Sequence, residues 1–124
     1  MPERVIVCGG RDFQDRASVF SVLDQLHASS GIECLIEGGA EGADTFARDW
    51  AEAHLAPENR IREDANWTKY GKAAGPIRNS LMLTYAPTLV IAFPGHTGTA
   101  DMVTKAKRKH VEVWSIAPVR QDTP

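Results

Sequence analysis

One stretch decides the fold of this chain: Thr88-Leu-Val-Ile-Ala-Phe-Pro-Gly-His-Thr-Gly-Thr-Ala-Asp-Met102. It opens with an unbroken apolar run rich in β-branched residues, which is typical of a strand covered on both faces of a parallel sheet. Pro94 ends this strand because it has no N–H group to offer the sheet. Gly95 and Gly98 then allow a sharp turn, and a helix is predicted to open at about Thr99.

The loop between this strand and this helix has the chemistry of a cradle for phosphate or carboxylate. Thr97 and Thr99 supply hydroxyl groups, and the start of the helix supplies unpaired N–H groups and the positive end of its dipole. The predicted cradle also takes in the other residues of the loop: Pro94, Gly95, His96 and Gly98. The alternative is a plain strand-to-helix turn whose glycines serve geometry alone, and this stretch by itself leaves both open.

Strands and helices alternate along the rest of the chain. Apolar runs predict further strands at residues 4–8, 32–36 and 111–116 and a short one near Ile61, with helical spacing between them. The alternation predicts a single Rossmann-like three-layer α/β domain over residues 1–116, with a mostly parallel sheet of about five strands in the order 3-2-1-4-5. Residues 117–124 are expected to form a flexible tail.

The segment before the central strand combines a loop and a helix. Residues 66–75 are polar, aromatic and glycine-containing, and a loop suited to binding is predicted there. The helix after it is expected to turn an apolar face inward, formed by Ile77, Leu81, Met82 and Tyr85.

Three predicted strands end in glycine-bearing turns, which contain Gly9-Gly10, Gly38-Gly39, and Gly95 with Gly98. In the order 3-2-1-4-5, strands one and four are neighbours whose helices leave on opposite faces of the sheet. The first and third turns therefore flank one crevice at the topological switch point, where open α/β sheets bind ligands. Chance accounts poorly for three such turns, so the sequence favours a binding site.

Several charged residues belong to this predicted site. Arg11 and Asp12 follow strand one at the crevice. Asp44 is expected in the first turn of the helix that follows strand two. Arg78 offers a planar fork for phosphate or carboxylate, and Asn79 has the donors and acceptor to read a base edge or a ribose hydroxyl.

For two aromatic residues and one aspartate, the sequence leaves both a functional and a structural role open. Trp67 and Tyr70 either stack on a base or pin their loop to the domain. Asp101 lies in the first turn of the cradle helix, where a carboxylate is stabilising in itself, so a structural role competes with a catalytic one.

Composition, charge and the absence of certain motifs argue against several classes of protein. The chain has 124 residues, of which 43% are hydrophobic and 24% charged, and its net charge of −2 argues against a generic nucleic-acid binder. No segment approaches the roughly 20 apolar residues of a membrane span. Neither common nucleotide-binding glycine motif is present. Cys8 and Cys34 lie in apolar runs and the histidines lack ligand spacing, so we expect a cytoplasmic protein without metal or cofactor.

The aromatic content also bears on assembly. Trp50, Trp67 and Tyr70 are expected to give more aromatic surface than so small a domain needs. Such surface is typical of interfaces, and a homodimer or higher homo-oligomer is predicted.

Four ordered motifs resemble the small YspA-like, YpsA-related branch of the SLOG superfamily. They are Val-Ile-Val-Cys-Gly-Gly-Arg-Asp-Phe13, Ile36-Glu-Gly-Gly-Ala-Glu-Gly-Ala-Asp44, Ala74-Gly-Pro-Ile-Arg-Asn79 with Met82, and Phe93-Pro-Gly-His-Thr-Gly-Thr-Ala-Asp-Met102. The resemblance implies a Rossmann-like fold that binds nucleotides or nucleotide-derived ligands. Related LOG phosphoribohydrolases cleave the N-glycosidic bond of adenine-type nucleoside monophosphates, and other relatives sense ADP-ribose-type signals or bind single-stranded DNA.

The signature of these enzymes is P-G-G-x-G-T-x-x-E, preceded by R-K-x-x-M. This chain is similar at residues 94–99 and 78–82, but His96 replaces a glycine and Met102 stands where the catalytic glutamate would be. A well-placed carboxylate stabilises an oxocarbenium-like transition state, so Met102→Glu is expected to raise any hydrolysis if the family geometry is otherwise kept. Asp101 is adjacent but points roughly 100° away around the helix.

The sequence therefore predicts a module that binds a nucleotide or nucleotide-derived phosphate ligand between strands one and four, as a sensor or sequestering protein. The alternative is a phosphoribohydrolase acting on a nucleoside 5'-monophosphate through Arg78 with Asp101, or with Asp12 or Asp44. Single-stranded nucleic-acid binding is a weaker alternative.

Overall fold

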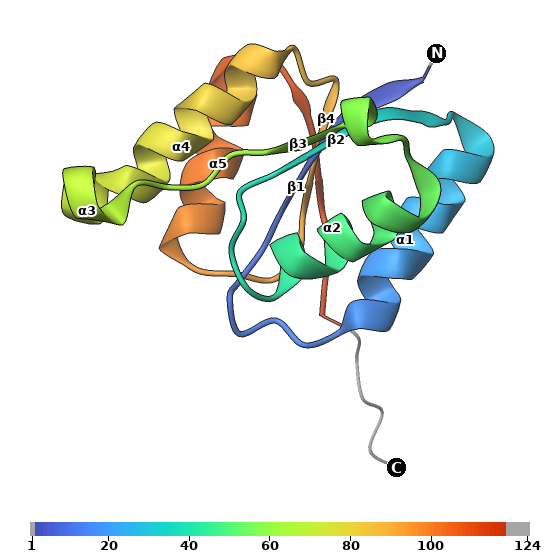
Figure 1. The fold of residues 1–124 in the computed structure, drawn as a ribbon, viewed down its shortest axis with the longest axis horizontal. Coiled ribbons are helices and arrows are strands. Elements are labelled where there is room, and N and C mark those ends of the chain that lie inside the picture. The colour runs from blue at the N-terminus through green and yellow to red at the C-terminus, as the bar shows by residue number, and fades with distance from the viewer. Residues whose placement is uncertain (1, 119–124) are drawn as a thin grey trace.

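The computed structural model describes residues 2–118, and a parallel sheet forms the centre of this part (Figure 1). Its five strands lie in the order β3-β2-β1-β4-β5, which confirms the predicted class and strand order. The strands are β1 (Glu3–Cys8), β2 (Ile32–Glu37), β3 (Arg60–Arg62), β4 (Leu89–Ala92) and β5 (Glu112–Ser115). Most of the predicted tail, residues 119–124, lies outside the described residues.

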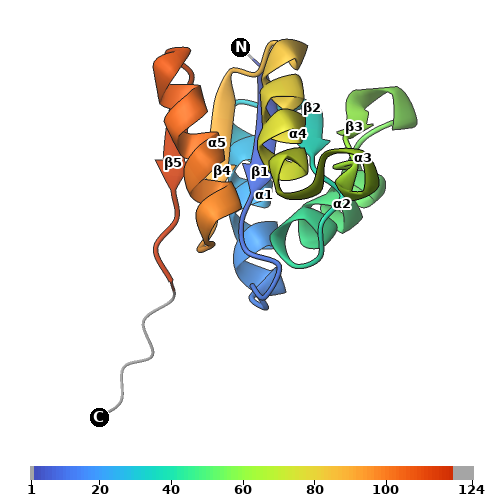
Figure 2. The same ribbon diagram turned by 90° about the vertical axis from the view of Figure 1, so that its left-hand side faces the viewer.

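Helices cover both faces of the sheet (Figure 2). One face packs against α1 (Arg16–Ser29) and α2 (Ala43–His54), and the other against α4 (Ala74–Met82) and α5 (Thr97–Arg108). Successive side chains of β1 point to opposite faces of the sheet. Val5 and Val7 pack in the first layer, with α1 and α2, and Ile6 and Cys8 pack in the second layer, with α4 and α5. None of the helices in the described part is long and apolar enough to cross a membrane.

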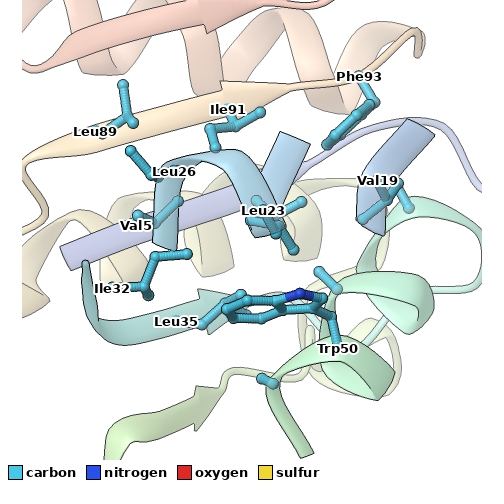
Figure 3. Packing of buried hydrophobic residues seen from close by; sticks show 14 residues of the cluster. Val5, Val19, Leu23, Leu26, Ile32, Leu35, Trp50, Leu89, Ile91 and Phe93 are labelled. Carbon is cyan, nitrogen blue, oxygen red and sulfur yellow. The ribbon is translucent and has the colours of Figure 1, made fainter. Parts of the chain in front are cut away.

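Trp50 is the largest fully buried side chain and belongs to the first layer, where it lies near Leu35 and Leu23 (Figure 3). Its side chain is fully buried, so its predicted place on the surface is wrong. Trp50 lies on the inner face of α2 with Ala47 and Ala51, and its indole N–H donates to Asp24 Oδ1 at 2.8 Å. Because that donor has a partner, burying the whole ring carries no unsatisfied polar group.

The segment before β4 differs from the prediction in two ways. Most of residues 66–75 are helical rather than a loop: α3 (Trp67–Tyr70) is capped by Asn66 Oδ1 and is followed by the 3-10 turn Gly71–Ala73. Helix α4 is rotated relative to the predicted face. It buries Met82 as predicted, but Asn79 is buried as well, and Ile77 and Leu81 are each 42% exposed.

Two short 3-10 turns complete the described part, Pro57–Asn59 before β3 and Leu83–Tyr85 after α4. Helix α5 begins at Thr97, two residues earlier than predicted. Gly98 and Thr99 therefore lie in its first turn, and the loop after β4 is shorter and tighter than the sequence suggested.

Candidate functional site

The loops that follow β1, β2 and β4 pack against one another at the carboxyl edge of the sheet. Gly10 N donates to the carbonyl oxygen of Pro94 at 2.9 Å, which ties the first loop to the third. A Cβ atom on Gly95 would collide with Thr99 Oγ1 and lie 2.8 Å from Gly10 N. A Cβ on Gly42 would collide with Gly10 O, and Gly42 also has a φ of 74°. The contact between these loops therefore requires glycine.

A cavity of about 670 Å³ lies beside these loops, on the face of the sheet that carries α4 and α5. Most of the residues predicted for the site line it: Gly9, Gly10, Arg11, Asp12, Asp44, Trp67, Arg78, Asn79, His96, Thr97, Gly98 and Thr99. Those absent from its lining are Gly38, Gly39, Pro94, Gly95 and Asp101. Pro94 and Gly95 instead line a neighbouring depression that shares Asp12 and His96 with it.

The N-terminus of α5 opens onto this cavity. His96 precedes the helix without capping it by a side-chain hydrogen bond, and Thr97, Gly98 and Thr99 line the cavity wall. The first N–H groups of a helix have no partner within the helix. A Cβ atom on Gly98 would meet nothing within 4 Å, so the fold itself does not require glycine at this position. The space over Gly98 is open to a ligand.

A chain of hydrogen bonds positions Arg78 at the same wall. Its Nη1 donates to the carbonyl oxygen of Gly38 at 2.6 Å, and its Nε donates to Asn79 Oδ1 at 3.0 Å. Asn79 Nδ2 in turn donates to the carbonyl oxygen of Gly98 and to Asp101 Oδ2, both at 3.0 Å. Asn79 is 2% exposed, so this network joins the β2 loop to the start of α5 from a buried position.

Asp101 is engaged in holding α4 against α5. Besides the bond from Asn79, its carboxylate pairs with Lys105 Nζ at 3.0 Å, and Lys105 also donates to the carbonyl oxygen of Pro76 at 2.7 Å. The first turn of α5 contains no acidic residue, so the predicted place of Asp101 in that turn is wrong. Its structural role comes from these contacts between the two helices instead. A catalytic role for Asp101 stays a prediction.

Met102 does not face the cavity. It is fully buried in the apolar cluster between α4, α5 and the sheet. A glutamate at this position would place its carboxylate in that cluster, so the structure does not support the expectation that Met102→Glu raises hydrolysis.

Two carboxylates of the cavity differ in their environment. Asp44 is 5% exposed, and burial raises its pKa to about 6, although N–H groups of Gly38 and Ala40 and the nearby Arg78 act in the opposite direction. Asp12 is exposed, and the hydrogen bond with His96 holds the pKa of Asp12 below its usual range. Asp44 therefore changes its charge near neutral pH, whereas Asp12 stays ionised.

The rim of the cavity carries cations and an aromatic ring. The guanidinium carbon of Arg11 lies 5.0 Å from the centre of the Trp67 ring, which is 47% exposed. Lys72 also lines the cavity. Sequence reasoning missed Lys72, although it lies within the segment 66–75 that was predicted to bind.

Other residues of the lining were also missed: Cys8, Ala40, Gly75, Pro76 and Met82. Cys8 and Met82 are buried, and their apolar character marked them as core alone. They form part of an apolar floor, and burial raises the pKa of the Cys8 thiol far above its usual range, so it stays neutral.

Comparison with known proteins places the chain among its relatives. The model of the YspA, cpYpsA-related SLOG family matches residues 3–70, from β1 through α3. The Gene 61 protein of Mycobacterium phage D29 is 33% identical over 116 residues, which cover 89% of this chain and 93% of that protein. The family match spans more than half of the chain and includes the loops after β1 and β2 that meet at the cavity. The chain belongs to the YspA, cpYpsA-related SLOG family.

Proposed function

We propose that this domain binds a nucleotide or nucleotide-derived phosphate ligand in the cavity beside β1 and β4, as a sensor or a sequestering module. Its family suggests a nucleotide-related ligand in general terms. The observation that carries the proposal is the uncapped N-terminus of α5, which opens onto the same cavity as Arg78. A helix N-terminus and a guanidinium group are both well suited to phosphate.

The rest of the cavity suits the other parts of a nucleotide. Trp67 and Arg11 at the rim offer a flat surface on which a base stacks. The apolar floor at Cys8 and Met82 contacts the uncharged part of the ligand. A volume of about 670 Å³ lies within the usual range of small-molecule sites. We place the phosphate at residues 97–99 and the base toward Trp67.

Gly98→Val is expected to weaken the binding of AMP or ADP-ribose about 100-fold, measured by isothermal titration calorimetry. The branched side chain would occupy the space over the helix N-terminus, and two hydrogen bonds to a charged group contribute about 1.5 kcal/mol each. The fold should survive because the new Cβ meets no neighbour. Thr104→Val, on an exposed part of the same helix, is the matched control. Unchanged affinity in a folded Gly98→Val variant would remove the cradle from the proposal.

The second candidate function is that of a phosphoribohydrolase. The position and the raised pKa of Asp44 favour it. Asp44 lines the cavity and has a pKa of about 6, which suits a general acid or base near neutral pH. Adenine released from AMP in the same titration samples separates hydrolysis from binding. Release that is lost in Asp44→Asn but kept in Asp101→Asn would assign the reaction to the cavity carboxylate.

We further propose that the domain assembles with a second copy of itself through α3 and α4. Ile77 and Leu81 lie one turn apart on the outer face of α4, and Trp67 and Tyr70 expose 47% and 40% of their surface on the adjacent α3. Exposed apolar side chains in this number are typical of an interface.

For the cellular setting we propose the cytoplasm, since the free thiols of Cys8 and Cys34 are both buried and suit a reducing compartment.

Sedimentation equilibrium is expected to show a dimer or higher oligomer for the unmodified protein and a monomer for Leu81→Lys. A lysine would bring a charge into the apolar contact. Trp114→Lys, at an exposed position of β5, is the control and should leave the assembly unchanged. A monomer at high micromolar concentration of the unmodified protein would refute the proposal.

A further inference from the structure

A second cavity lies on the opposite face of the sheet, between α2 and the edge formed by β2 and β3. Its volume is about 300 Å³, and it shares no lining residue with the first cavity. Its wall is partly apolar, with Leu35, Ala51 and Ile61. The rest is charged, and the nucleotide proposal uses none of it.

Three arginines line this cavity: Arg48 on α2, and Arg60 and Arg62 on β3. The Nε of Arg62 is held by Asp64 Oδ1 at 2.9 Å. Within residues 2–118, the guanidinium groups of Arg48 and Arg60 make no ion pair. Two guanidinium groups without an ion pair thus border a small, partly apolar cavity, whose lining also holds the carboxyl groups of Glu37 and Glu52. Guanidinium groups in such a setting attract an anion.

Glu37 is the buried polar group of this cavity. It is 2% exposed, and its Oε1 accepts a hydrogen bond from Gly39 N at 2.6 Å. The charged groups around it are Arg48, Glu52 and Asp44 on α2, together with Arg60 and Arg62 on β3. Burial raises the pKa of Glu37 to about 7, so the carboxyl group takes up a proton near neutral pH. The protonated group adds a hydrogen-bond donor and removes a negative charge.

We propose that this cavity binds a phosphate-bearing small molecule through Arg48 and Arg60, beside the buried carboxyl group of Glu37. Guanidinium forks suit the terminal oxygens of a phosphate monoester in shape and charge. The apolar wall contacts the organic part of the ligand. The proposal concerns a site separate from the nucleotide cavity and stands or falls independently of it.

Titration with sulfate, followed in ¹H–¹⁵N correlation spectra, tests the site, because sulfate keeps its charge from pH 6 to pH 8. The amide signals of Ala51 and Ile61 report the second cavity, and those of Gly98 and Thr99 report the first. Saturable shifts are expected at Ala51 and Ile61. Arg48→Gln and Arg60→Gln should each weaken this binding about tenfold and leave the response at Gly98 and Thr99 unchanged.

Arg108→Gln removes one positive charge at the end of α5, away from this cavity, and is the matched control. Absence of saturable shifts at Ala51 and Ile61, or equal weakening by Arg108→Gln, would overturn the proposal. The first outcome is also what two ordinary solvated surface arginines would give.

Two further measurements identify the role of Glu37 and the kind of ligand. Sulfate should bind more tightly at pH 6 than at pH 8, and Glu37→Gln should bind it at both values while losing this pH dependence. Binding that is independent of pH in the unmodified protein would remove Glu37 from the site. Phenyl phosphate should bind more tightly than inorganic phosphate because of the apolar wall, whereas equal affinities would overturn the organic ligand in favour of the free ion.

Discussion

Met102→Glu is expected to lower the free energy of unfolding by at least about 3 kcal/mol at pH 8, the scale of an uncompensated buried charge. Met102 is fully buried in an apolar cluster with Ile6, Ile36 and Val90. At pH 8 a glutamate in this cluster is either ionised without a partner or protonated at a pH where it would be ionised in water. Both states cost free energy. The pKa of this glutamate in the folded protein would therefore lie above the unfolded value of about 4.3, and the loss of stability should grow as pH rises through the interval between the two.

Denaturant unfolding at pH 5 and pH 8 measures this loss, with Met102→Leu as the control. Leucine keeps the apolar volume and should cost less than about 1.5 kcal/mol. Adenine release from AMP should not rise in the glutamate variant, because the side chain points into the core rather than the cavity. A stable Met102→Glu protein with increased hydrolysis would show that the carboxylate reaches the cavity and would contradict this account of the helix.

Gly95→Ala is expected to destabilise the fold by about 1–3 kcal/mol, the usual range for an overpacked site. The new methyl group would collide with Thr99 and lie 2.8 Å from Gly10 N, and backbone atoms at that distance have little freedom to withdraw. Thermal or denaturant unfolding measures the change.

Gly98→Ala is the control for Gly95→Ala, since both glycines belong to one short stretch and were predicted to serve the same turn. A methyl group at Gly98 meets no neighbour within 4 Å and replaces glycine in a helix, so stability should be unchanged or slightly higher. Equal losses in the two variants would mean that the contact between the loops is looser than the structure indicates.

Local pattern was enough to predict the sheet and the neighbourhood of the cavity. The apolar runs of β1 and β4 are typical of strands covered on both faces, and right-handed crossovers then leave few strand orders. The glycine turns mark where these strands end. Gly10 and Gly98, far apart in the chain, could therefore be assigned to one crevice, and both line the cavity.

Periodicity was a weaker guide to which face of a helix is buried. In α4 the spacing of Ile77 and Leu81 predicts an inward apolar face, but both are half exposed. Asn79 faces inward instead because it completes hydrogen bonds with Arg78, Gly98 and Asp101. Gly98 and Asp101 lie on α5, far along the chain from α4, so the residue pattern of α4 alone does not reveal these hydrogen bonds.

The sequence by itself determined the α/β class, the strand order, the family and most of the residues around the cavity. Each of these depends on patterns within a few residues or on general rules of chain connection. Only the tertiary structure decided the burial of Trp50 and the different surroundings of Asp101 and Met102. It also decided the raised pKa of Asp44 and the position of Arg48 and Arg60 at one cavity. Burial and charge at these positions are set by groups far away in the chain, because solvent exclusion and Coulomb interactions depend on distance in space rather than in sequence.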